Sequence, residues 1–149
     1  MGPKFENQDH VPGKRYHVKN ISVPDPAIKD QWEYEEVDLP DVRTTGHLMI
    51  RILIGKILDE ARFVAILRSV PVVQHNHNWT CRTWVMQSLS ALERDDQAMG
   101  TAILDGPRIE SIAKQYAANK IAANRFETSS NSLDPKPAYD LLNNKEMIP

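Results

Sequence analysis

Two short runs near the start of the chain alternate between polar and apolar residues, and this period of two is typical of β-strands. They cover residues 15–20 (RYHVKN) and 31–37 (QWEYEEV). The aromatic and aliphatic residues share a face in each run: Tyr16 and Val18 in the first, Trp32 and Tyr34 in the second. Because a turn-rich segment with two prolines separates the runs, we expect an antiparallel hairpin whose aromatic face packs inward.

The middle of the chain combines an apolar run with an amphipathic segment. Residues 48–57 (LMIRILIGKI) fit either a buried strand or a helix. Their isoleucines favour the strand, and Gly55 within the run and Asp59 after it predict a break. Asp59 is expected to cap a helix over residues 60–69. That segment carries an apolar stripe at spacings of three and four: Phe63, Ile66 and Leu67.

Two longer helices are predicted further along the chain. Asn78 or Thr80 can cap the first of them, which ends at the charged turn 93–97 (ERDDQ). Its predicted inner face contains Cys81, Trp84, Val85, Ser88, Leu89 and Leu92. The second is predicted over about 107–125, because proline favours the first helical position. Its predicted inner face contains Ile109, Ile112, Ala113, Tyr116, Ala117 and Ile121.

Together these elements predict one α+β domain over residues 1–149, a length at which a chain can bury a sizeable core. We expect a small antiparallel sheet packed against the cysteine-bearing helix and the second long helix. Residues 1–14 lack periodicity and are expected to form a loop. Residues 127–149 are polar and are expected to wrap the surface, anchored by Tyr139, Leu141 and Leu142.

Charge and cysteine content exclude several classes of protein. The 18 Lys and Arg residues nearly balance the 20 Asp and Glu residues, so neither nucleic acid nor an anionic membrane is an expected partner. No apolar run approaches the roughly 20 residues needed to span a bilayer, and none near the start has signal-peptide length. We therefore expect a soluble, cytoplasmic protein. The single cysteine excludes an intrachain disulfide.

No metal or cofactor is expected from the sequence. His75 and His77 lack a partnering carboxylate cluster at ligand spacing. The chain also has no Gly-rich phosphate loop and no G-x-S-x-G elbow. Nucleotide-dependent and serine-hydrolase activities therefore have no support in the sequence.

Cys81 and His17 are the candidate catalytic residues. Cys81 begins a predicted helix, where main-chain N–H groups and the helix dipole favour a thiolate, and an imidazole can accept the thiol proton. His17 lies on the strand face opposite Tyr16, and Glu33 or Glu35 on the paired strand could orient its ring. From residue type alone, Cys81 is more often a small core residue, and His17 more often a surface residue.

Several segments resemble a family of small fungal proteins of unknown function, from RYHVKN and WEYEEV through NWTCRTWV to YDLLNNKEMIP. This resemblance covers residues 15–149. More remotely, an N-x-x-C motif with an aromatic residue three positions on (Asn78, Cys81, Trp84) is similar to the cysteine helix of NlpC/P60 and lecithin-retinol-acyltransferase-like proteins. Those folds are papain-like, and His17 preceding Cys81 matches their permuted branch. The resemblance implies that the branch's first strand is absent, which leaves an unpaired sheet edge for a protein partner.

Two functions fit these expectations. In the first, the protein is a thiol hydrolase or acyltransferase in which Cys81 attacks an amide, ester or thioester carbonyl and His17 acts as base and then acid. Glu33 would orient the imidazole, Asn78 belongs to the same motif, and N–H groups at the helix start would stabilise the oxyanion. In the second, it is a non-catalytic papain-like domain that binds a protein partner or a small molecule, accessory to a secondary-metabolite pathway.

Overall fold

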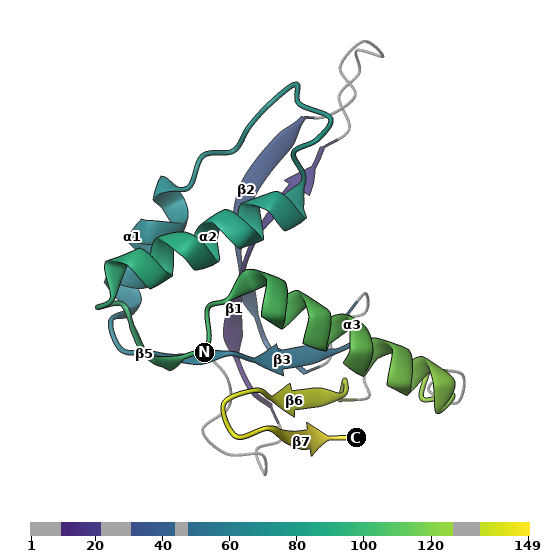
Figure 1. The fold of residues 1–149 in the computed structure, drawn as a ribbon. Helices are drawn as coiled ribbons and strands as arrows, with labels where there is room; N and C mark the ends of the chain where they lie inside the picture. The colour runs from purple at the N-terminus through teal and green to yellow at the C-terminus, as the bar shows by residue number, and fades with distance from the viewer. Residues whose placement is uncertain (1–9, 22–30, 44–47, 127–134) are drawn as a thin grey trace.

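The computed structural model describes residues 10–21, 31–43, 48–126 and 135–149 (Figure 1). Within these ranges the chain has the mixed α+β architecture that the sequence predicts. The helices are α1 (Glu60–Ser69), α2 (Cys81–Asp95) and α3 (Gly106–Ala122). The strands are β1 (Gly13–Asn20), β2 (Trp32–Leu39), β3 (Arg51–Leu53), β4 (Gly55–Ile57), β5 (Met99–Ala102), β6 (Ala138–Asp140) and β7 (Lys145–Ile148). None of the helices in the described ranges has the length and apolar character required to cross a bilayer.

β1 and β2 form the predicted antiparallel hairpin, with Val18 opposite Tyr34 and His17 opposite Glu35. Side chains alternate along each strand, so the aromatic and aliphatic residues share one face, which packs against α2 as predicted (Figure 1). Tyr34 contacts Trp84 of α2, with ring centroids 5.5 Å apart. The buried core cluster comprises Val18, Leu67, Val70, Trp79, Trp84, Leu92 and Ala98.

The hairpin has two strands among the described residues, so β1 and β2 each keep one edge without a partner strand. A side chain covers part of the edge of β2. The Gln74 amide accepts a hydrogen bond from Trp32 N at 2.9 Å and donates one to the Trp32 carbonyl at 2.8 Å. Gln74 therefore satisfies main-chain groups that an added strand would otherwise pair with at this position.

The apolar run at 48–57 contains two short strands, separated at Ile54. The predicted break therefore falls one residue before Gly55. β4 pairs antiparallel with β5, and Gly55 lies opposite Ala102. A Cβ on Gly55 would lie 2.8 Å from the Ala102 Cβ, so this close approach of the two strands requires glycine.

Aspartates cap α1 and α3. The Asp59 carboxylate accepts a hydrogen bond from Arg62 N at 2.9 Å, which confirms the predicted cap. Asp105 accepts the equivalent bond from Arg108 N at 2.9 Å, so α3 begins at Gly106, one residue before its predicted start. Both caps satisfy N–H groups that have no partner inside the helix.

We expect Asp59→Ala to lower the free energy of unfolding by about 1 kcal/mol, because the first turn of α1 then loses the oxygen that Arg62 N donates to. Urea denaturation followed by circular dichroism measures this change. Asp59→Ser keeps a capping oxygen and should stay within a few tenths of a kcal/mol of the wild type. An equal loss in the two variants would contradict the capping role.

α2 begins after Thr80, whose N–H donates to the Thr83 hydroxyl at 3.2 Å. Of the two predicted caps, the structure therefore selects Thr80 and not Asn78. The predicted inner face is buried at Trp84, Ser88, Leu89 and Leu92. The prediction is wrong for Cys81, which is exposed, and for Val85, which is 44% exposed. Both residues lie in the first two turns, where the described elements leave that side of the helix uncovered.

α3 packs beside the sheet of β3, β6 and β7 (Figure 1). The buried ring of Tyr116 lies against Tyr139, with centroids 5.4 Å apart, and its hydroxyl donates to the Glu146 carboxylate at 2.6 Å. The helix ends at Ala122, before the predicted end. Ile121 is 55% exposed, against the prediction, because the end of α3 extends past β6.

The described part of the C-terminal segment belongs to this sheet. β6 pairs parallel with β3 and antiparallel with β7. Of the predicted anchors, Leu141 is buried, and Tyr139 and Leu142 are half-buried. Residues 135–149 thus contribute strands, while 127–134 of the predicted tail and 1–9 of the predicted N-terminal loop lie outside the described residues.

Candidate functional site

The predicted nucleophile, Cys81, is the first residue of α2 and is exposed. It is therefore not the small core residue that residue type alone favours. Across the described ranges, no hydrogen bond joins Cys81 to His17, Glu33 or Asn78. Asn78 lies exposed in the preceding turn, where its main-chain N–H donates to the Asn76 side chain at 3.0 Å.

His17 lies in the middle of β1, and its partner is Glu35 rather than Glu33. The His17 Nε2 atom is 2.8 Å from Glu35 Oε2, and Lys19 Nζ donates to Glu35 Oε1 at 2.6 Å. The hydrogen bond from Lys19, followed by that from His17, holds the pKa of Glu35 below its usual value. The strand register explains the choice of partner, because it places His17 opposite Glu35 and Lys19 opposite Glu33.

The hairpin separates His17 from Cys81. Val18 and Tyr34 face the core that α2 helps to form. Because successive side chains on a strand point to opposite faces, His17 and Glu35 point away from the helix that carries Cys81. A nucleophile and its base must lie roughly 2.6–3.2 Å apart or share one water. The structure does not bring this pair together.

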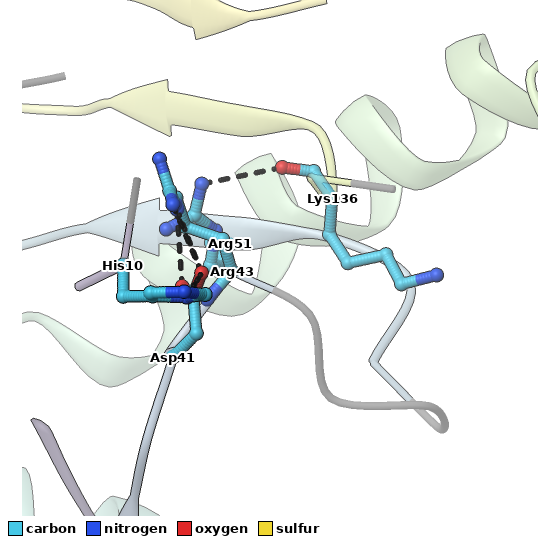
Figure 2. Close-up of polar contacts among 5 residues, drawn as sticks. All are labelled: His10, Asp41, Arg43, Arg51 and Lys136. Atoms are coloured by element: carbon cyan, nitrogen blue, oxygen red, sulfur yellow. Dashed lines mark hydrogen bonds and ion pairs between the residues drawn. The ribbon is translucent and has the colours of Figure 1, made fainter. Parts of the chain in front are cut away.

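A second polar cluster lies where four chain segments meet, and we call it the arginine junction. It contains His10, Asp41, Arg43, Arg51 and Lys136 (Figure 2). Main-chain hydrogen bonds hold the segments in place. Val42 N donates to the Val11 carbonyl at 2.8 Å, and Lys136 N donates to the Arg43 carbonyl at 3.0 Å. The junction is therefore fixed by the backbone of the fold.

Asp41 and Arg43 form a two-point ion pair within the junction. Arg43 Nε donates to Asp41 Oδ1 at 3.0 Å, and Arg43 Nη2 donates to Asp41 Oδ2 at 2.9 Å. Their side chains are only 8% and 12% exposed. The hydrogen bonds from Arg43 hold the pKa of Asp41 below its usual value. His10 Nδ1 lies 3.9 Å from the same carboxylate on a largely exposed ring, so Arg43 is the principal partner.

Arg51 lies beside this pair without a carboxylate of its own among the described residues. Its main-chain N–H donates to the Pro137 carbonyl at 2.8 Å, and its Nη2 donates to the Lys136 carbonyl at 3.3 Å. Its Nε is buried and finds no hydrogen-bond partner in the described part of the chain. Burial and then the nearby charge of Arg43 hold the pKa of Arg51 below its ordinary value.

The members of the arginine junction are scattered along the chain and form no motif, so the sequence alone does not predict this cluster. One signal could have drawn attention to it. Arg51 is the only charged residue within the apolar stretch 48–54 (LMIRILI), and a charge in such a run needs a partner when the run is buried.

The ranges that the structure describes contain no candidate metal site. No group of three or more His, Cys, Asp or Glu side chains gathers there in a way that could hold a metal ion. His75 adopts a positive φ of 55° in the turn before α2, and both His75 and His77 are exposed.

The hairpin, the three helices and the short sheets define a mixed α+β protein. Residues 1–148 match the model of a family of unknown function, DUF6914, and the chain belongs to this family. No curated protein and no solved structure matches the chain. The remote similarity to papain-like NlpC/P60 proteins therefore has no support from relatives or structural neighbours.

Proposed function

We propose that the protein is a non-catalytic binding domain for a small molecule or a protein partner. The observation that supports this proposal is the placement of His17 and Cys81 on opposite sides of the hairpin. Glu35 pairs with His17 on the outer face, where Lys19 shares the carboxylate. In the described residues no other side chain forms a hydrogen bond with Cys81.

The competing hypothesis, a thiol hydrolase or acyltransferase, needs a base beside Cys81. The helix dipole favours a thiolate, but proton transfer to the leaving group requires an acid–base residue within reach. A shift of one residue in the register of β1 would bring His17 to the inner face. The same shift would turn Val18 and Tyr16 toward solvent, because every side chain of the strand changes face. The packed core opposes that rearrangement.

Alkylation of Cys81 tests the proposal directly, because Cys81 is the only cysteine and all labelling reports on one site. We expect the rate of iodoacetamide labelling to be the same in the wild type, His17→Ala and Glu35→Gln at every pH, since neither side chain reaches the thiol. Mass spectrometry across a pH series measures the rates.

One labelling result would contradict the binding-domain proposal. A labelling rate in mildly acidic buffer that falls at least tenfold in His17→Ala would show that the imidazole activates the thiol. The thiol-enzyme hypothesis would then replace the binding-domain proposal. Circular dichroism of both variants controls for loss of the hairpin.

A further inference from the structure

The guanidinium of Arg51 is a partly buried charge whose counter-charge is missing from the described residues. A guanidinium carries five N–H donors, and the structure pairs one of its nitrogens, Nη2, with the Lys136 carbonyl. The Nε is buried without a partner, while Nη1 also has no partner but keeps access to solvent. This charge is therefore incompletely satisfied on the protein side.

The carboxylate beside Arg51 in the junction, that of Asp41, already forms hydrogen bonds with Arg43. Asp41 accepts three side-chain hydrogen bonds and one main-chain hydrogen bond from Arg43. Figure 2 shows the side chains of Arg43 and Arg51 next to one another, with Asp41 bonded to the first and not to the second. Among the described side chains of the junction, the positive charge of Arg51 is left without a paired carboxylate. Lys136 also has no ion pair among the described residues and adds to the positive charge there.

Buried charges in proteins are usually paired, because an uncompensated charge in a poorly solvated place is costly. Buried polar atoms without partners are rare for the same reason, so each one calls for an explanation. Among the described residues, Arg51 has a partly buried charge without an ion pair and a buried Nε without a hydrogen-bond partner. Main-chain hydrogen bonds hold the segments around it in place. An external anion at the solvent-accessible Nη1 would compensate the charge of the guanidinium, and a cation would be repelled by it.

We propose that the arginine junction is a binding site for an oxyanion, a phosphate or carboxylate group carried by a small molecule, with Arg51 as the principal donor. The Nη1 of the guanidinium keeps access to solvent and can donate N–H groups to the oxygens of either group, while its charge favours an anion. The Asp41 carboxylate is directed toward Arg43 and forms no hydrogen bond with Arg51. This inference names the ligand class of the binding domain proposed above and rests on that proposal.

The probes are inorganic phosphate and acetate, each titrated into the full chain by calorimetry at constant ionic strength, with sodium chloride as the balancing salt. We expect saturable binding of at least one probe, and the stronger of the two identifies the group. Arg51→Met should weaken this binding at least tenfold, and Arg51→Lys should give an intermediate loss because it keeps the charge but not the planar fork. Arg108→Met, which removes an exposed arginine from the first turn of α3, should leave binding within twofold of the wild type.

A second measurement keeps the test decisive if Arg51→Met does not fold. The Nε–Hε resonance of Arg51 in the wild type should shift with the probe and saturate at the calorimetric midpoint. The proposal is overturned if neither probe saturates, or if Arg51→Met and Arg108→Met bind equally well. If neither probe saturates and Cys81 labelling does not depend on His17, the oxyanion site is contradicted and the binding-domain proposal stands. Saturable binding with His17-dependent labelling would remove the binding-domain proposal and keep the site.

Discussion

Replacing Trp84 with alanine is expected to lower the free energy of unfolding by about 3–5 kcal/mol, the largest effect of any single change considered for this protein. Trp84 is 2% exposed and belongs to the core cluster, where its ring contacts Tyr34 across the interface between α2 and the hairpin. Alanine would leave a cavity between these two elements. Urea denaturation, followed by far-ultraviolet circular dichroism, measures the loss.

A phenylalanine at the same position is the matched control. The Trp84 Nε1 atom is buried and has no hydrogen-bond partner among the described residues, so its N–H is desolvated without compensation. Trp84→Phe removes that unpaired group and retains an aromatic ring against Tyr34. We therefore expect a clearly smaller loss than for Trp84→Ala. Equal losses in the two variants would show that the ring does not fill the space between α2 and β2.

Asp41→Asn should lower the free energy of unfolding by roughly 3 kcal/mol near neutral pH, because it removes the buried carboxylate with which Arg43 forms its two-point ion pair. The amide keeps the shape of the side chain, so the loss reports on charge. Asp38→Asn is the control. Asp38 is 86% exposed and lies 3.6 Å from Lys14, and removal of such a surface ion pair should change stability little.

The same variant has a defined dependence on pH. The pKa of Asp41 is lower in the folded protein than its ordinary value of 3.8, because Arg43 hydrogen-bonds the ionised form. The carboxylate's contribution is therefore fully present above about pH 3.8 and disappears as the pH falls through the lowered pKa. Denaturation curves of wild type and Asp41→Asn should converge in strong acid. A gap that persists unchanged there would mean that Asp41 acts through packing and not through charge.

The local parts of the fold could be predicted from the sequence, because local chemistry determines them. Alternating residues in 15–20 and 31–37 define two strands and their inner faces, and the connection between them allows one simple pairing. The carboxylate of Asp59 defines the start of α1, since it can satisfy an N–H group only at that point. These features depend on neighbours within a few positions of one another.

The remaining features depend on contacts that no local pattern contains. The parallel pairing of β3 with β6 joins segments far apart in the chain, so the C-terminal strands could not be foreseen from composition. The choice of Glu35 over Glu33 follows from the strand register, which the two runs alone leave open. Cys81 has the periodicity of an inner residue but lies in a turn of α2 that nothing described covers. The candidate site at Arg51 could not be predicted either, because it forms only where segments far apart in the chain come together.

The wide spacing of the segments around Arg51 also determines when the site can form during synthesis. The hairpin pairs His17 with a residue 18 positions away, whereas the hydrogen bond from Arg51 to Lys136 spans 85 positions. Closing the longer loop costs more chain entropy and must wait until the later segment has left the ribosome. The N-terminal hairpin can therefore assemble while translation continues, and the arginines acquire their final surroundings last. Anion binding would report that a newly made chain has finished folding.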